Sequence, residues 1–419
     1  VNFLIKTPIL NGGFFIFVTM NRDYIFLVFF SFTFFIPDFG SIDLIAPKAF
    51  YLSIISFIFL LFNRSFIIDV FDNTSFIFTL YILLFIISLF SSIYAINIPE
   101  VFIFSFRLFV YICALISLYI IFNRNNSLII FPFFLQMILF VEVLFLLNDF
   151  NNLSDNFNFS TRFMGSGSSS NINISSFSLL FKIPFSILLY EFTKSKILKA
   201  LSLFTIAASI FFIIIQGSRA AFVVILIYLL SYLILFTIQR KFLIQLLSLI
   251  TVSVTTFYIT NNAVINRVSS VDIVSDSSTS YRLNLYNGVL NSFVENPLFG
   301  TGAGNYKISS IFYNNLNIQS YIMPYHAHND FLEYLSDLGI IGFLIYLSIF
   351  IFLFSYIVRI ILLSDKSIQL VGFTCMLSFI AYFFDSLFNF PSSRVIQQLF
   401  FMSLTSFVLI IHNNYVSKK

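Results

Sequence analysis

Long apolar stretches joined by short polar connections make up most of the chain, and they predict membrane-spanning helices. A run of about 18 or more apolar residues can cross the hydrocarbon core of a bilayer as a helix. The pattern predicts twelve spans, of which the first two are the shortest. They cover residues 24–37, 49–62, 76–94, 101–122, 127–148, 174–190, 197–216, 220–238, 242–259, 339–363, 368–387 and 396–412.

Two connections are much longer than the others. One is rich in Asn and Ser, and the second is long enough to form a small subdomain. Long ordered loops commonly carry function. The fold expected is an all-α polytopic membrane protein whose one long outer loop carries short helices. Its parts are helices one to five in 1–148, an outer polar loop in 149–173, helices six to nine in 174–259, the long loop in 260–338 and the last three helices in 339–419.

The long loop contains its own pattern. Apolar side chains at helical spacing, from Leu283 to Phe293, predict a short amphipathic helix that lies over the membrane surface. Pro297 and the spaced glycines of 300–304 end it. These glycines resemble a dinucleotide-binding fingerprint, but no strand precedes them, so we interpret them as turns.

Composition and charge agree with a membrane protein. The chain is 59% hydrophobic and only 10% charged, whereas average soluble proteins have about 25% charged residues. Lys and Arg concentrate in the predicted inner segments, so we expect both termini to be cytoplasmic. No basic block predicts nucleic-acid binding. Cys113 and Cys375 fall in predicted spans, which favours core residues over a disulfide or metal pair.

Two of the three histidines, His326 and His328, lie where a polar segment meets an apolar helix. An imidazole titrates near neutral pH and is therefore a ready proton acceptor. Asp330 and Glu333 have the spacing of a capping box, with Asp330 as the cap, so a helix is expected to begin just after His328. The helix dipole would then keep the His328 ring neutral. The alternative is a surface histidine without a role.

Arg219 is predicted on the outer side, at the start of a helix whose dipole disfavours a cation. A cation in that position indicates an anionic ligand, and the alternative is an arginine that reaches the membrane interface. Taken singly, Arg282 and Arg162 are solvated charges of the outer loops. Gly339 and Gly342 suit close helix packing at the membrane entry.

Four ionisable residues fall in the outer halves of predicted spans: Arg107, Glu142, Lys182 and Asp385. Ionisable groups inside a membrane usually pair and commonly mark a pathway or site. We interpret them as signs of a polar cavity open to the outer face. Reaching the outer interface explains Arg107 equally well.

The motifs together resemble the O-antigen ligase and Wzy-type polymerase family. They are Arg219 in QGSRAAF, a long outer loop with Arg282, and the segment HAHNDFLEYLSDLGIIG. The family pattern of His-Asn, nine residues and Gly-x-x-Gly fits from His328 to Gly342 without a gap. The resemblance is sharp over about residues 215–345, whereas the first 150 residues carry no motif.

The resemblance implies a GT-C-like glycosyltransferase in the bacterial inner membrane, with no metal or other cofactor. It implies transfer of an oligosaccharide from undecaprenyl pyrophosphate, on the periplasmic side, to a second glycan or to lipid A core, with a chain-length regulator as a further partner. His328 would correspond to the catalytic histidine, and Arg219 and Arg282 to the arginines that bind pyrophosphate. The substrate-binding candidates are Arg162, Tyr281, His326 and Asn329. The chain has no Trp, so acceptor sugars would stack on Tyr or Phe.

Three alternatives remain open. Ligase and polymerase would share a donor and a site, so the sequence does not separate them. A lipid-linked glycan flippase or other transporter also often has twelve spans, although its usual paired halves are not evident here. A different glycosyltransferase could use Asp38 or Asp43 of the first outer loop as its base.

Overall fold

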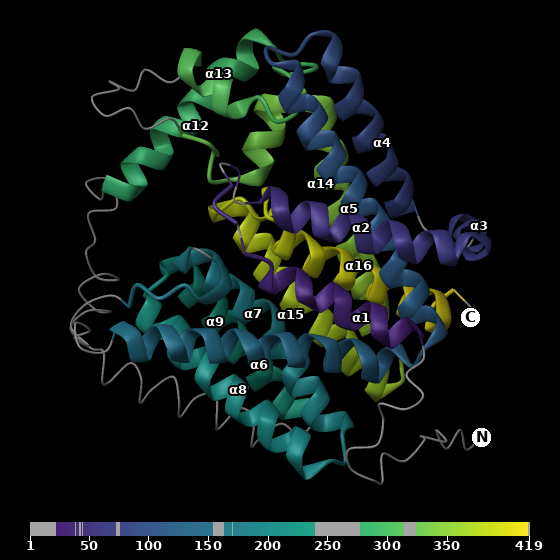
Figure 1. Ribbon diagram of the computed structural model, residues 1–419. Coiled ribbons are helices and arrows are strands. Elements are labelled where there is room, and N and C mark those ends of the chain that lie inside the picture. Colours follow the sequence, from purple (N-terminus) through teal and green to yellow (C-terminus); the bar gives the residue numbers. More distant parts are fainter. Residues whose placement is uncertain are drawn as a thin grey trace.

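The computed structural model describes residues 22–37, 39–41, 43, 45–72, 76–153, 163–169, 171–238, 277–313 and 324–417. Regular structure within these ranges is helical throughout, which confirms the all-α prediction (Figure 1). The helices are α1 Arg22–Phe32, α2 Ala46–Phe62, α3 Arg64–Asp72, α4 Phe76–Phe90, α5 Ile98–Arg124, α6 Ser127–Leu153, α7 Ile172–Phe192, α8 Lys196–Gln216, α9 Arg219–Ile238, α12 Ser277–Glu295, α13 Tyr306–Tyr313, α14 Asp330–Ile361, α15 Lys366–Phe388 and α16 Val395–Tyr415. Short 3-10 turns are η2 Thr33–Phe35, η3 Ser91–Ile93, η5 Gly167–Ser169 and η7 Pro391–Ser393.

Eight segments in the described ranges are long and apolar enough to cross a membrane, so the chain is a multi-pass membrane protein. They are α4 with η3, α5, α6, α7, α8, α14, α15 and α16. Helices α2 and α9 are shorter apolar helices, and α1 with η2 covers most of the first predicted span. The predicted span 242–259 lies outside the described residues, so the number of twelve stays a prediction.

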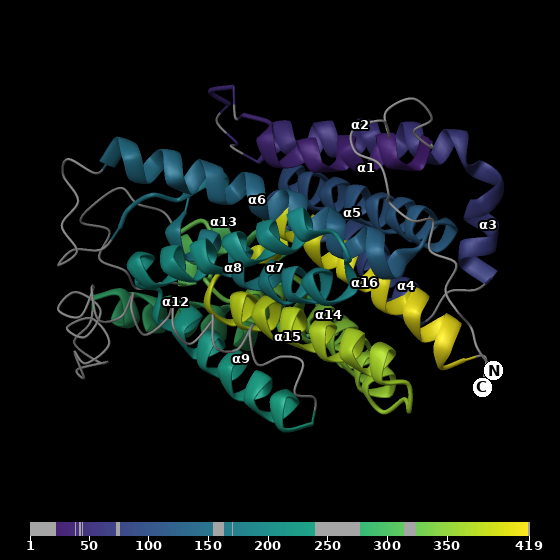
Figure 2. The same cartoon turned by 90° about the horizontal axis from the view of Figure 1, so that it is seen from below.

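Helix α16 forms the centre of the bundle (Figure 2). Its apolar stretch is entirely buried, and that of α7 is 89% buried, whereas α5 and α15 reach 61%. A helix that is apolar all round needs neighbours on every side. Accordingly α16 packs along α5 and α14, and α7 packs against α6, α8 and α15.

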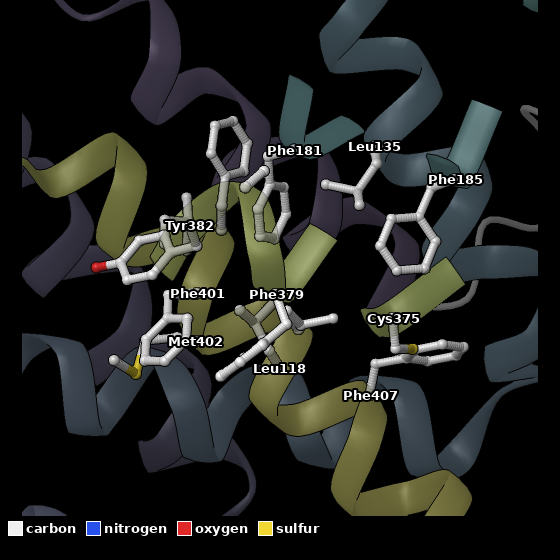
Figure 3. Packing of buried hydrophobic residues seen from close by; sticks show 14 of the residues in the cluster. Leu118, Leu135, Phe181, Phe185, Cys375, Phe379, Tyr382, Phe401, Met402 and Phe407 are labelled. Atoms are coloured by element: carbon white, nitrogen blue, oxygen red, sulfur yellow. The ribbon is translucent and has the colours of Figure 1, made fainter. Parts of the chain in front are cut away.

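Aromatic rings fill the space between these helices (Figure 3). Phe401 of α16 stacks on Tyr382 of α15, with ring centroids 4.1 Å apart and an angle of 7°. Phe407 of α16 meets Phe131 of α6 at 4.5 Å. Such pairs contribute about 0.5–1.5 kcal/mol beyond burial. Some of the 63 Phe of this chain thus fill the core, whereas others, such as Phe50 and Phe102, are exposed.

The four predicted intramembrane charges have different surroundings. Lys182 Nζ lies 2.6 Å from Glu142 Oε2, and both side chains are buried between α7 and α6. Asp385 accepts a hydrogen bond from the side chain of Asn389. Arg107 pairs with Asp43 and lines a cavity of about 40 Å³, together with four tyrosines and Ser392. Three of these four residues, Arg107, Glu142 and Lys182, therefore form ion pairs inside the bundle.

Helix α14 breaks its regular conformation at Gly339, which has φ 63° and ψ −163°. A Cβ atom there would lie 2.4 Å from the carbonyl carbon of Leu298, and the N–H of Ile340 donates to the carbonyl of Pro297 at 2.9 Å. Gly300 faces the same crossing, because its Cβ would meet the Asp337 backbone at 2.5 Å. At Gly339 the predicted close packing is therefore present, but its partner is the turn after α12 and not another helix. A Cβ at Gly342 would instead meet the Leu338 side chain of α14 itself.

Gly339→Ala should destabilise the protein more than Gly40→Ala. Both glycines have a positive φ, which costs a residue with a Cβ about 1–2 kcal/mol. Gly40 has open space around its Cβ position, whereas Gly339 meets backbone, so overpacking adds about 1–3 kcal/mol. Thermal unfolding of the detergent-purified variants measures the difference. Equal melting temperatures for the two would contradict the described crossing.

Candidate active site

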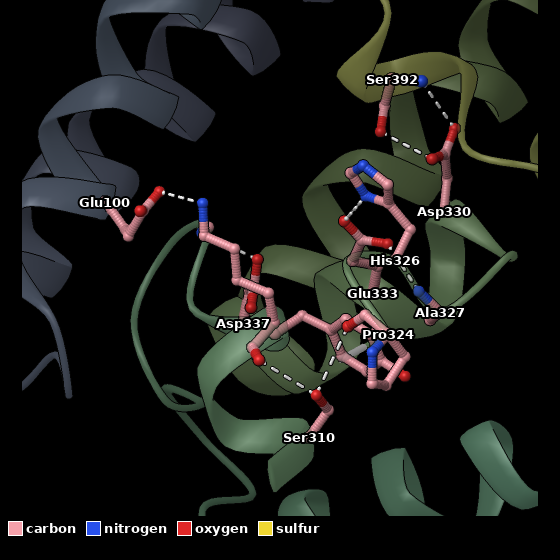
Figure 4. Close-up of polar contacts among 12 residues, drawn as sticks. Glu100, Ser310, Pro324, His326, Ala327, Asp330, Glu333, Asp337 and Ser392 are labelled. Atoms are coloured by element: carbon pink, nitrogen blue, oxygen red, sulfur yellow. Dashed lines mark hydrogen bonds and ion pairs between the residues drawn. The ribbon is translucent and has the colours of Figure 1, made fainter. Parts of the chain in front are cut away.

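The first turn of α14 positions the two histidines. Asn329 caps this helix, since its Oδ1 accepts a hydrogen bond from the N–H of Leu332 at 3.1 Å. The predicted helix start just after His328 is confirmed, but the prediction of Asp330 as the cap is wrong. The Asp330 carboxylate accepts hydrogen bonds from Ser392, from its Oγ at 2.7 Å and its N–H at 3.0 Å (Figure 4). These bonds hold the connection between α15 and α16 against the start of α14.

His328 adopts a left-handed backbone conformation with φ 56°, which is uncommon for a residue other than glycine. Its carbonyl accepts a hydrogen bond from the Tyr286 hydroxyl at 3.4 Å. The half-buried ring meets Phe390 edge-on at 5.1 Å. Among the described residues, the buried Nδ1 has no hydrogen-bond partner. Strained residues of this kind cluster at functional sites.

Burial, and next the charge of Arg282, lowers the pKa of His328 to about 4. His326 and Arg394 act in the same direction, and Glu333 opposes them. The ring is therefore neutral near pH 7 and able to accept a proton. This is the protonation state that the sequence predicted, but its main causes are burial and nearby cations. An anion bound among these cations would raise the pKa again and make His328 a stronger base.

His326 is held by Glu333 of the same first turn (Figure 4). Its Nδ1 lies 3.0 Å from Glu333 Oε1, and Glu333 Oε2 accepts the N–H of Ala327 at 3.0 Å. The ring stacks on Phe390 with centroids 4.1 Å apart. Glu333 therefore orients a histidine and the segment before the helix, a role that its expected place in a capping box did not predict.

Arg282 is on α12, the helix that the spacing from Leu283 to Phe293 predicts. Leu285 and Val289 form its buried side, whereas Leu283 is exposed, so the helix is rotated relative to the expected apolar face. It packs on α14 and α13. Arg282 and Tyr281 are half-buried, and Arg282 is close enough to His328 to lower its pKa.

Arg219 is half-buried at the first residue of α9, two residues after the left-handed Gly217 that ends α8. It is not one of the charges that act most strongly on His328. Its approach to Arg282 therefore stays a prediction. Arg162 lies outside the described residues. In the parts of the chain that the structure describes, no three His, Cys, Asp or Glu side chains form a set of metal ligands.

Arg394, at the N-terminal boundary of α16, is a site residue that the sequence analysis missed. Its guanidinium carbon lies 4.9 Å from the centre of the Phe390 ring, and its charge lowers the pKa of His328. The Phe390 ring thus contacts both histidines and this arginine. The sequence held a signal for it, because Arg394, like Arg219, is a cation at the start of a helix and on the side predicted to be the outer one.

Comparisons with known proteins match the same region. Residues 204–347 match the family model described as O-Antigen ligase. The curated "Putative polysaccharide ligase" of Rickettsia conorii is 26% identical over 145 residues, which is 33% of this chain. The matched part spans 32% of that relative. The predicted resemblance to the O-antigen ligase family is thereby confirmed, and the matched stretch contains Arg219, Arg282 and His328.

Proposed function

Because residues 204–347 resemble the O-antigen ligase family, we propose that this protein joins polysaccharides as a membrane glycosyltransferase. The donor is an oligosaccharide on undecaprenyl pyrophosphate, and the acceptor is a sugar hydroxyl of a second glycan or of lipid A core. The observation that carries the proposal is the neutral, strained His328 beside Arg282. A proton acceptor next to a cation is what hydroxyl attack with departure of an anion requires.

The reaction follows from these residues. A sugar hydroxyl attacks the anomeric carbon of the donor, and its proton passes to the His328 imidazole. The bond from the anomeric carbon to the phosphate oxygen breaks, and its electrons leave with the pyrophosphate. Arg219 and Arg282 stabilise the departing charge through bidentate hydrogen bonds. Arg162, Tyr281, His326 and Asn329 are proposed to contact substrate.

The proposed location is the periplasmic side of the bacterial inner membrane, with both termini cytoplasmic. Consecutive membrane helices run in opposite directions, and this alternation supports a position of all the site residues on the same side of the membrane. Helices α9, α14 and α16 begin there, with Arg219, His328 and Arg394 near their first residues. The long loop 260–338 would then face the periplasm, where a chain-length regulator could contact it.

A rival glycosyltransferase mechanism with Asp43 as the base has weaker support. Both carboxylate oxygens of Asp43 already accept hydrogen bonds, from Arg107 and from the N–H of Ile45. Asp38 lies outside the described residues.

In a strain that lacks the native protein and expresses the variant instead, Arg219→Lys should strongly reduce the ladder of polysaccharide chains seen on a gel. Lysine keeps the charge but lacks the planar fork that binds phosphate through two hydrogen bonds. If Arg219 only reaches the membrane interface, lysine should serve almost as well. Gel analysis of the polysaccharide, with expression checked by blot, gives the result. A wild-type ladder at equal expression would remove Arg219 from the proposed pyrophosphate site.

A further inference from the structure

The connection between α15 and α16, residues 389–394, brings a second cation to His328. Its anchor is Ser392, whose hydroxyl and N–H both donate to the buried Asp330 at the start of α14. The connection therefore has a fixed position relative to the histidines. It places Phe390 against both imidazole rings and Arg394 against Phe390.

The Arg394 guanidinium has no hydrogen bond or ion pair with any other described residue. Its Nε is buried without a partner. Arg107 and Lys182, in contrast, are paired with Asp43 and Glu142. Arg394 as a whole is half-buried, and a cation with a buried donor is rarely left without a partner, because desolvation is costly. An anionic ligand, which the chain itself does not provide, would accept the hydrogen bonds of this guanidinium.

The neighbouring acidic groups do not fill this role. Asp385 and Asp43 act on Arg394 over a longer range and partly offset the lowering of its pKa by burial. Asp385 accepts its hydrogen bond from Asn389, and Asp43 pairs with Arg107. The Arg394 side chain is instead close to His328, on which Arg282 also acts.

We propose that Arg394 binds a phosphate oxygen of the donor diphosphate and, with Arg282, forms an anion site around His328. This inference rests on the proposed function, because the anion is the leaving group of that reaction. It adds a ligand from the last connection of the bundle, outside the matched residues 204–347. The planar forks of Arg394 and Arg282 suit the oxygens of a diphosphate diester, in addition to the Arg219 proposed above.

Binding of inorganic pyrophosphate to the full-length protein in detergent tests the proposal by calorimetry. Arg394→Gln should weaken binding about tenfold to hundredfold, as expected for loss of a hydrogen bond to a charged group. The pyrophosphate affinity of Arg394→Lys should lie between those of Arg394→Gln and the wild type. Arg359→Gln is the matched control, because Arg359 is exposed in the last turn of α14. It should bind like the wild type.

A second readout separates binding from a structural role. Since Arg394 lowers the pKa of His328, Arg394→Gln should raise that pKa in an NMR titration of the imidazole, and Arg359→Gln should leave it unchanged. Wild-type affinity and an unshifted His328 titration in Arg394→Gln would overturn the inference. If that result is found while the wild type still transfers glycan, only the role of Arg394 is refuted and the proposed function stands. A wild type that neither binds pyrophosphate nor transfers glycan would refute both.

Discussion

His328→Ala is expected to slow glycan transfer by about 10²–10⁴-fold, the usual contribution of one positioned general base. The ring is neutral near pH 7 because burial and Arg282 lower its pKa to about 4. It can therefore take the proton of the attacking hydroxyl, and alanine cannot. Alanine can adopt the left-handed backbone of His328 at a cost of at most about 1–2 kcal/mol, so the fold and membrane insertion should persist. Transfer per folded molecule, measured with purified protein, gives the ratio.

His412→Ala is the matched control for this experiment. His412 is on α16, where its ring contacts Tyr356 at 4.4 Å, near the end of that helix opposite Arg394. Its loss removes an imidazole without touching the proposed site, so transfer should continue. Near-complete transfer by His328→Ala, at the level of this control, would exclude His328 as the base.

Lys182→Met is expected to lower stability by about 3–5 kcal/mol, because it leaves a buried carboxylate without its counter-ion. Lys182 is fully buried, and the Glu142 side chain is 5% exposed. The ammonium group also bonds to the Ser178 carbonyl and hydroxyl. Thermal unfolding in detergent, together with the yield of folded protein, measures the loss.

The double variant Glu142→Gln with Lys182→Met is the control for that prediction. Removing both charges takes away the desolvation cost as well as the attraction, and such replacements are often close to neutral. The double variant should therefore regain most of the stability lost in Lys182→Met. A double variant as unstable as the single one would show that the ion pair is not the cause.

Hydropathy predicted most of the bundle, because a membrane helix needs a long apolar run and little else. The start of α14 was also predictable, since Asn329 and Asp330 are both good caps. Which of the two is the cap could not be predicted, because the Asp330 carboxylate instead binds Ser392, which is 62 residues away in the sequence. Contacts of that range have no local pattern in the sequence.

The same reason explains the other corrections at the site. The spacing of Gly339 and Gly342 indicated close packing, but the partner backbone, at Leu298, belongs to a turn in the long loop. Arg394 had the same local signal as Arg219, a cation at a predicted helix start, but only the fold shows that the connection from α15 to α16 lies beside His328. In contrast, the family resemblance pointed to His328 and Arg282, and in the structure Arg282 is close enough to His328 to lower its pKa.

Reconstitution separates the proposed glycosyltransferase from a flippase most directly. Purified protein in liposomes would receive a glycan on undecaprenyl pyrophosphate and a soluble sugar acceptor on the outer side. Undecaprenyl pyrophosphate should be released in an amount equal to the glycan joined to the acceptor, and His328→Ala should nearly abolish both. Movement of intact lipid-linked glycan across the bilayer, without release of undecaprenyl pyrophosphate, would contradict the proposed glycosyltransferase function.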